Sequence, residues 1–231
     1  PVGACVSGEI EIDDPDDFTR SLILQEGVLP SALAPVLPTL FIPGGRLLGA
    51  LESLIKGVYQ GPLSRLQTFF AVSHDSATGR LVLKDDRLTV SWPTVAQEPV
   101  FRRLDAALQA AVEAVGGRYM KSPLAGTSVG DKPFTAHPLG GCRMADDPAG
   151  GVVDSGHRVF APRKGGTGVH DGLYVIDGAV MPRSLGVNPL LTITALAERA
   201  SMLIARERGL IFDAAPRAPS ASLQQLLRSE N

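Results

Sequence analysis

The chain has 231 residues, of which 44% are hydrophobic and 20% are charged, as in an ordinary globular protein. A net charge of −2 at pH 7 argues against the strongly basic surface of a nucleic-acid-binding protein. The sequence has no run of about 18 apolar residues that would predict a membrane-spanning helix. Its two cysteines and four histidines predict neither a disulfide framework nor a metal site.

The N-terminal part predicts two short strands joined by an acidic turn. Glu9–Ile12 alternates acidic and apolar residues, the pattern of a half-buried strand. The turn over residues 13–17 is interpreted as a solvated loop rather than a calcium site, because no bidentate glutamate follows at the required spacing. Ser21–Gly27 predicts the second strand. Glu26, near its end, follows an apolar run, and such a partly desolvated carboxyl group suits proton transfer.

Residues 29–59 are apolar and contain four prolines, which prevent one long helix. Residues 46–56 predict a short amphipathic helix with its leucines on one side. Two interpretations stay open here: a mobile lid over an apolar substrate, and an irregular insert packed on the core.

The middle of the chain predicts antiparallel strands followed by a helix. Strands are expected at residues 66–72, 80–84 and 88–92, with a hairpin turn at Asp85-Asp86. His74 lies between these strands and is interpreted as a surface residue. Apolar residues at three- and four-residue steps predict a helix over residues 99–115. A helix laid on an antiparallel sheet is an α+β arrangement.

Residues 126–130, Gly-Thr-Ser-Val-Gly, match the Gly-x-Ser-x-Gly elbow of serine hydrolases. Asp154 and His170 follow in the order of a Ser-Asp-His triad. The elbow requires a buried strand before the serine and a helix after it, whereas the prolines on both sides predict a loop. A serine hydrolase using Ser128 therefore stays an alternative.

Two later segments hold most of the residues that could carry chemistry. Residues 135–144 place His137 before a proline and a Gly-Gly pair. Residues 172–199 predict a strand, a turn at Asp177-Gly178, a loop and a helix. Asn188 is a favoured N-cap, and Pro189 fits a first helical position. The unpaired N–H groups at such a helix start suit an electron-rich ligand.

In combination, these segments resemble the C-terminal part of the glucose–methanol–choline (GMC) flavin oxidoreductases, with the cholesterol oxidase branch nearest. The resemblance covers about residues 135–204. It implies an α+β fold: residues 1–170 would form an antiparallel-sheet substrate-binding domain with helices. Residues 171–209 would be the last strand and helix of an FAD-binding α/β (Rossmann-like) domain, and residues 210–231 a tail.

The resemblance also implies FAD as cofactor, although the Gly-x-Gly-x-x-Gly fingerprint of dinucleotide binding does not occur in this sequence. The fingerprint is therefore expected in a missing N-terminal FAD-binding half or in a partner chain.

Roles for individual residues follow from the same resemblance. His137 would be the base that accepts the substrate hydroxyl proton while a hydride passes to flavin N5. Asn188 would lie beside that hydroxyl, which conflicts with its use as a helix cap. Glu26 would move a proton during double-bond isomerisation. The residues implied to contact FAD are Asp177, Gly178, Asn188, Pro189 and Leu190.

The function implied is the FAD-dependent oxidation of an apolar, sterol-like small-molecule alcohol. Many GMC enzymes have a second histidine where this chain has Asn188, and the asparagine favours the sterol-oxidising branch. Besides the Ser128 hydrolase, a second alternative is a substrate-domain fragment that is catalytically inert by itself. Neither nucleic acid nor a transmembrane segment is expected.

Overall fold

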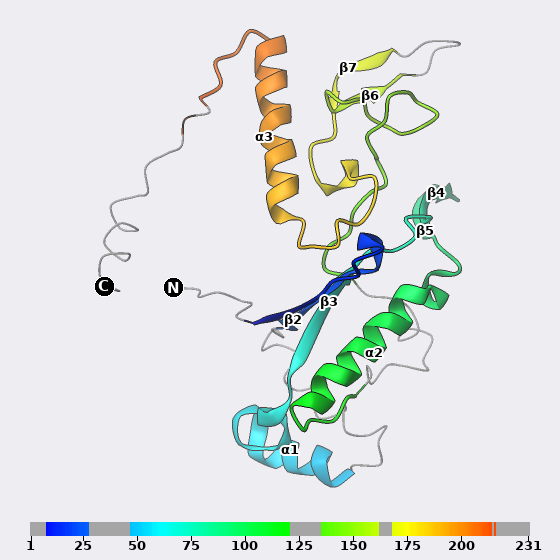
Figure 1. Cartoon of the computed structure of the whole chain (residues 1–231). Coiled ribbons are helices and arrows are strands. Elements are labelled where there is room, and N and C mark those ends of the chain that lie inside the picture. The colour runs from blue at the N-terminus through cyan, green and yellow to red at the C-terminus, as the bar shows by residue number, and fades with distance from the viewer. Residues whose placement is uncertain (1–7, 28–46, 121–134, 162–167, 214, 216–231) are drawn as a thin grey trace.

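The computed structural model describes residues 8–27, 47–120, 135–161, 168–213 and 215. Within these ranges the chain forms small antiparallel sheets and three α-helices. Figure 1 shows the three-stranded sheet β1–β3 with α1 and α2 in one part of the molecule, and β6, β7 and α3 in another. The α+β prediction of antiparallel strands with helices is confirmed at this level.

The first sheet is formed by β1 (Glu9–Ile12), β2 (Leu22–Gly27) and β3 (Thr68–Ser73), with β2 in the centre. Both pairings are antiparallel, and Gln25 lies opposite Glu9 on one side and Phe70 on the other. The predicted strands in this part of the chain are therefore confirmed. Leu22 and Leu24, which share one face of β2, are buried.

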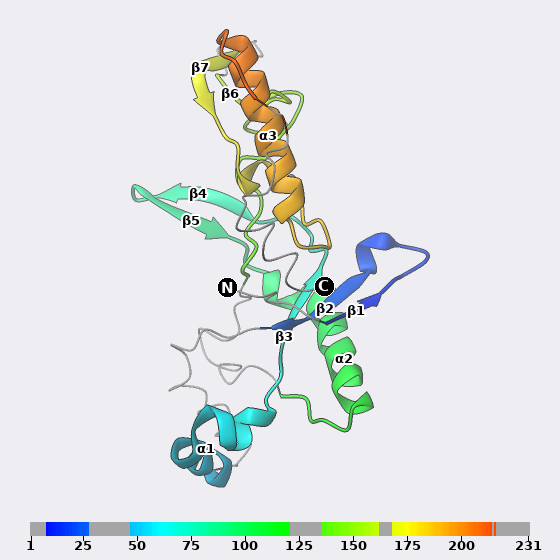
Figure 2. The same cartoon turned by 90° about the vertical axis from the view of Figure 1, so that its left-hand side faces the viewer.

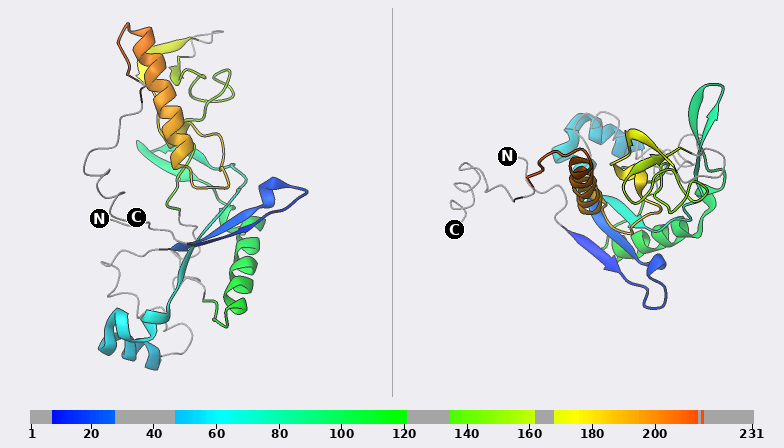
Figure 3. Two further views of the ribbon diagram at one scale, coloured as in Figure 1. Left: turned by 60° about the vertical axis from the view of Figure 1, so that its left-hand side comes forward. Right: turned by 90° about the horizontal axis from the view of Figure 1, so that it is seen from above.

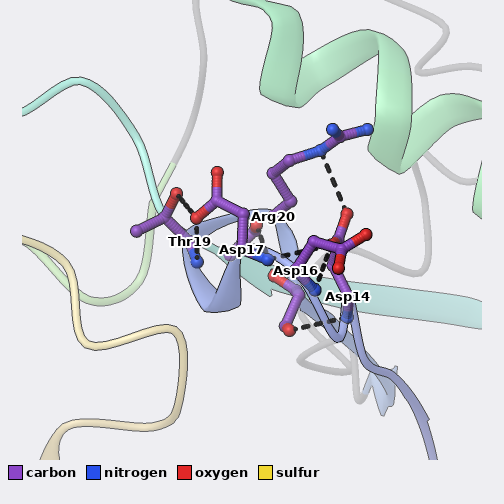
Figure 4. Close-up of polar contacts among 7 residues, drawn as sticks. Asp14, Asp16, Asp17, Thr19 and Arg20 are labelled. Carbon is purple, nitrogen blue, oxygen red and sulfur yellow. Dashed lines mark hydrogen bonds and ion pairs between the residues drawn. The ribbon is translucent and has the colours of Figure 1, made fainter.

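The acidic turn between β1 and β2 satisfies its carboxylates locally (Figure 4). Asp14 accepts hydrogen bonds from the backbone N–H groups of Asp16 and Asp17, and it pairs with Arg20 at 3.1 Å. Asp17 accepts from both the backbone N–H and the hydroxyl of Thr19. These bonds lower the pKa of Asp17. The carboxylates therefore order the turn, and no metal-binding cluster is found among the described residues.

Helix α1 (Leu47–Gln60) contains the predicted short helix and is interrupted at Gly57, whose φ of 71° is not helical. Four of its apolar side chains face outward: Leu48, Leu51, Leu54 and Ile55 are between 56% and 83% exposed. The interpretation of a segment packed on the core therefore does not hold for these side chains.

Helix α2 (Pro99–Ala114) agrees with its prediction and ends before Gly116, whose φ is +69°. It begins with a proline, which loses nothing there because the first N–H groups of a helix have no intrahelical acceptor.

Strands β4 (Arg80–Lys84) and β5 (Arg87–Ser91) form the predicted hairpin. Asp85 and Asp86 both have positive φ, at 50° and 60°, which is the geometry of a type I′ turn. Every residue of the two strands is exposed, and Figure 2 shows the hairpin projecting from the molecule.

The C-terminal part contains β6 (Arg158–Phe160), β7 (Val169–Tyr174) and α3 (Leu190–Glu207). Its buried side chains include Val153, Phe160, Val180, Met181, Ala200 and Ala205. Figures 1 and 3 show α3 beside this segment and far from α1. Strand β7 begins before residue 172, where the predicted strand, turn and helix segment starts, because Val169 pairs with Phe160. The predicted domain boundary at residue 170 thus falls inside β7, and the division into domains stays a prediction.

The shorter elements are 3-10 helices at Phe18–Arg20, Pro62–Arg65, Val95–Gln97 and Gly178–Val180. Among the described residues, no helix is long and apolar enough to span a membrane.

Candidate functional site

Backbone hydrogen bonds join the two segments that the sequence singled out. The N–H groups of Gly140, Cys142 and Met144 donate to the carbonyl groups of Gly178, Ala179 and Val180, at 3.1, 3.0 and 2.9 Å. These three bonds attach residues 140–144 to the turn at 178–180. The loop that begins at His137 is therefore fixed next to the turn before α3.

The Gly-Gly pair is required by this path. Gly140 and Gly141 have φ values of +81° and +103°, a region that residues with a Cβ rarely adopt. A Cβ on Gly141 would also lie 2.6 Å from Cδ1 of Leu81, on β4. The exposed hairpin therefore reaches the Gly-Gly pair at this point.

Gly178 lies in close contact with side chains from two other segments. A Cβ there would lie 3.1 Å from Cδ1 of Ile193 and 3.2 Å from Cδ2 of Leu139. Helix α3 and the His137 loop thus meet over this glycine. Its predicted contact with FAD stays a prediction.

Asp177 precedes the turn and caps it, because its Oδ1 accepts a hydrogen bond from the N–H of Ala179 at 2.9 Å. His137 is exposed, and its backbone N–H donates to the hydroxyl of Thr135. Its imidazole makes no hydrogen bond within the described part of the chain. The ring nitrogens are therefore available to a ligand.

Asn188 does not cap α3, so the prediction made from the local pattern is wrong. The residue at the N-cap is Pro189, which has no side-chain hydrogen bond to offer. The Asn188 amide instead donates from Nδ2 to Oε1 of Gln25 on β2, at 2.9 Å. Leu190, which starts the helix, is 72% exposed. The start of α3 thus presents uncapped N–H groups and an apolar side chain to its surroundings.

Gln25 is the residue of this site that the sequence did not reveal. It is only 6% exposed and donates from Nε2 to a carboxylate oxygen of Glu9 at 3.1 Å. Because side chains alternate along a strand, the neighbouring Glu26 points to the opposite face of β2. The structure therefore brings Gln25, and not Glu26, to Asn188, and the role of Glu26 in proton transfer stays a prediction.

His74 was interpreted as a surface residue, but it supports the loop before Asn188. Its Nδ1 is 3.1 Å from the carbonyl oxygen of Ser184, and the ring fills the place that a Cβ on Gly186 would take. The Ser184 hydroxyl donates to the carbonyl of Ser73 at 2.7 Å. Phe18 meets the His74 ring edge to face at 5.4 Å. The end of β3 therefore holds this loop.

His74 also lines a cleft of about 780 Å³, together with residues that include Glu98, Arg103 and Arg183. Neither His137 nor Asn188 lines it. Hydrogen bonds from Ser76 and from the Trp92 indole occupy the Glu98 carboxylate. The candidate site is therefore placed by the motifs and their contacts, and not by this cleft.

The alternative triad receives no support from the described residues. Ser128 lies outside them. Asp154 forms an ion pair with Arg158 at 2.6 Å, and His170 is exposed on β7. Partial burial raises the pKa of Asp154, but hydrogen bonds from Arg158 outweigh that effect and lower it. No described contact joins Asp154 to His170.

Comparison with known proteins finds similarity over part of this chain. Residues 98–197 match the GMC oxidoreductase family. The chain is 53% identical over 72 residues to a cholesterol oxidase of Acinetobacter baumannii, covering 31% of this chain and 12% of that protein. It is 49% identical over 71 residues to a cholesterol oxidase of Mycobacterium tuberculosis, covering 31% and 11%. A long-chain-alcohol oxidase of Arabidopsis thaliana is 39% identical over 72 residues, covering 31% and 8%.

Among solved structures, the chain is similar to pyridoxine 4-oxidase from Mesorbium loti. The two are 20% identical with a TM-score of 0.44, over 86% of this chain and 37% of that one. A likeness at this level does not define a shared fold. The matched segments span only about a tenth of the length of the cholesterol oxidases. The resemblance read from the motifs is nevertheless confirmed: residues 98–197 match the GMC oxidoreductase family, and the chain is similar over part of its length to cholesterol oxidases.

Proposed function

We propose that the protein carrying this chain is an FAD-dependent oxidoreductase that oxidises the CH–OH group of an apolar, sterol-like alcohol. The observation that carries the proposal is the hydrogen-bonded ladder from residues 140–144 to residues 178–180. It holds the His137 loop against the turn that leads to Asn188 and α3. The names of the relatives, cholesterol oxidase and long-chain-alcohol oxidase, support the same reaction class.

The start of α3 fits a flat, electron-rich ring. Pro189 provides no side-chain cap, so the first N–H groups of the helix are directed outward with the positive end of the helix dipole. Val187 and Leu190 are 48% and 72% exposed and offer apolar contact. In this proposal Asp177, Gly178, Asn188, Pro189 and Leu190 hold the isoalloxazine of FAD. The chemistry that FAD supplies when bound is acceptance of a hydride, which no side chain can perform.

His137 takes the proton in this scheme. Its exposed imidazole has no partner in the described part of the chain, so it can accept a hydrogen bond from an alcohol O–H. A neutral imidazole is a suitable base near pH 7. Asn188 orients the same hydroxyl, because a side-chain amide can donate and accept without taking up the proton.

Exposed apolar surface supports an apolar substrate and a large protein partner. Leu190 and Leu191 at the start of α3 are 72% and 82% exposed, and the apolar side of α1 is also uncovered. In the proposal α1 is a lid over the substrate. The remaining exposed side of α3 packs against the FAD-binding half, whether that half is in the same chain or in a partner.

The test is reduction of bound flavin by alcohols in the full-length protein, followed by absorption without oxygen. A flavin band that bleaches with a sterol alcohol is the expected result. His137→Gln is expected to leave flavin bound and to slow its reduction by about 10²- to 10⁴-fold. The matched control is His170→Gln, which replaces an exposed histidine on β7. Its bound flavin should be reduced at the parent rate. Reduction of His137→Gln at the parent rate would remove the base from the proposal.

A protein without flavin, or one whose flavin no alcohol reduces, would contradict the proposal as a whole. In that case the fluorophosphonate reactivity of Ser128, compared with Ser128→Ala, would examine the hydrolase alternative.

A further inference from the structure

We infer that Glu9 and Gln25 are positioning residues that set which way the Asn188 amide faces. The inference rests on the proposed function, in which Asn188 lies beside the substrate hydroxyl. It adds two residues from strands β1 and β2, outside the segment that matches the family.

The three side chains form one chain of hydrogen bonds. Glu9 and Gln25 are direct cross-strand partners in the antiparallel pair β1–β2, so their side chains lie on the same face of the sheet. Gln25 Nε2 donates to Glu9 Oε2 at 3.1 Å. Asn188 Nδ2 donates to Gln25 Oε1 at 2.9 Å. Gln25 is 6% exposed, so its own amide group has little access to water.

The Glu9 carboxylate fixes the direction of both hydrogen bonds in this series. An ionised carboxylate can only accept hydrogen bonds, so Gln25 must turn its NH₂ group toward Glu9. The Gln25 carbonyl oxygen then faces Asn188, and it too can only accept. Asn188 must therefore turn its NH₂ group toward Gln25. The Asn188 oxygen and its second N–H are left for other partners, each on a fixed side of the amide.

The backbone that carries Asn188 is held by other contacts. The preceding loop is fixed by His74 at the carbonyl of Ser184 and by the Ser184 hydroxyl at the carbonyl of Ser73. The helix that follows begins at Leu190 without a side-chain cap. Glu9 and Gln25 therefore act on the orientation of the Asn188 side chain, while the position of its backbone is set separately.

The decisive experiment reverses the donor-to-acceptor direction of these two hydrogen bonds. In Glu9→Lys the side chain can only donate, so Gln25 is expected to turn its oxygen to the lysine and its NH₂ group to Asn188. Asn188 must then accept through its oxygen and present only N–H groups to the substrate. The flavin reduction rate at saturating alcohol is expected to fall on the order of tenfold, because a misdirected group loses the productive geometry. KM for the alcohol should change less.

Glu11→Lys is the matched control. Glu11 lies on the same strand and the same face, and it has the same charge, but its cross-strand partner is Ile23. This variant should reduce flavin at the parent rate. The flavin reduction rate of Glu9→Gln is expected to lie between the rates of Glu9→Lys and Glu11→Lys. An amide at this position can face Gln25 with either its oxygen or its nitrogen.

A second readout does not depend on turnover. The chain contains two asparagines, Asn188 and Asn231, so selective ¹⁵N labelling of asparagine gives few side-chain amide signals from it. Comparison with Asn188→Asp identifies the Asn188 signal. One of its two protons should be shifted and protected from exchange in the parent and in Glu11→Lys, and should lose that protection in Glu9→Lys.

The outcomes separate the inference from the proposed function. Parent-like reduction and a parent-like Asn188 signal in Glu9→Lys would overturn the inference while leaving the function intact. A change in thermal stability alone, with both readouts unchanged, would also overturn it, because it would show a merely structural role. Failure of every alcohol to reduce the parent flavin would contradict the proposed function. The Asn188 signal would still show whether Glu9 determines the orientation of the Asn188 amide.

Discussion

The loop that carries His137 and the loop that carries Asn188 are held in place by different means. Residues 140–144 are bonded through their own backbone to the turn at 178–180. Residues 184–188 are held by side chains: His74 and Ser184 bridge the loop to β3, and Gln25 on β2 binds Asn188. The first arrangement needs glycines with positive φ, whereas the second needs particular polar side chains far away in the sequence.

The difference shows what each loop tolerates. A backbone ladder does not depend on the identity of most side chains, but it fails where an added Cβ meets backbone atoms. Support by side chains tolerates more change in the backbone and fails when one partner is replaced. Substitutions at the two loops should therefore differ in size and in whether a second substitution repairs them.

The largest effect is expected from Gly151→Ala, which acts on the backbone-held region. A Cβ at this position would overlap the carbonyl oxygen of Arg143 and lie 2.7 Å from Cβ of Ala145. That carbonyl accepts a hydrogen bond from the N–H of Val152 at 2.8 Å. Since backbone atoms cannot move aside cheaply, we expect a loss of about 3 kcal/mol in the free energy of unfolding.

Chemical denaturation of Gly151→Ala and of Gly168→Ala measures this loss. The nearest atom to a Cβ on Gly168 is the carbonyl oxygen of Ala161, at 3.7 Å, so this control should unfold with the parent. Equal stability of both variants would show that the backbone around Gly151 can shift to accommodate the added Cβ.

An intermediate and repairable effect is expected from Gly186→Ala in the side-chain-held loop. Gly186 has a φ of +71°, and a Cβ there would overlap Nε2 of His74 and lie 3.0 Å from its Cδ2. We expect a loss of about 2 kcal/mol. His74→Ala in the same protein should recover part of that loss, leaving roughly 1 kcal/mol for the left-handed backbone.

A double-mutant cycle over His74→Ala and Gly186→Ala measures this coupling by denaturation. Additive losses would mean that the His74 ring does not support the loop through Gly186.

The smallest effect is expected from Asp154→Asn and depends on pH. Burial raises the pKa of Asp154, but hydrogen bonds from Arg158 outweigh this and hold it below its ordinary value of 3.8. A lowered folded-state pKa stabilises the fold above pH 3.8, and that contribution is lost as the pH falls through the folded value. At pH 7 the loss should be about 1 kcal/mol, since Arg158 is partly exposed.

Thermal unfolding at pH 7 and below pH 3 checks this prediction, and the difference from the parent should shrink in acid. Asp171→Asn is the control, because its carboxylate is fully exposed although it pairs with Arg208 at 3.4 Å. A difference that persists unchanged in acid would exclude the ionised pair as its source.

Local patterns in the sequence were sufficient for most of the elements. The alternation in Glu9–Ile12, the Asp85-Asp86 turn and the spacing of apolar residues in α2 each depend on neighbours within a few positions. The assignment of His137 and Asp177 to one site came from the family resemblance and stays a prediction.

The features that the sequence did not show are those created by distant contacts. Asparagine is a residue type favoured at N-caps, but Asn188 binds Gln25, a partner that no local pattern indicates. Gln25 itself belongs to no motif, and only the structure shows that it is buried and bonded to Asn188. His74 was taken as a surface residue because its contacts, Phe18 and Ser184, lie far from it in sequence.

The bond between Asn188 and Gln25 also has a kinetic consequence. It joins residues that are 163 positions apart, whereas the ladder beneath the His137 loop spans about 40 positions. Folding slows as contacts become more distant in sequence, because a long loop must close before the contact forms. The His137 region can therefore assemble early, and the orientation of Asn188 is completed only when the first strands and the last helix have come together. A chain interrupted late in folding would contain His137 in place and the Asn188 amide still free to turn.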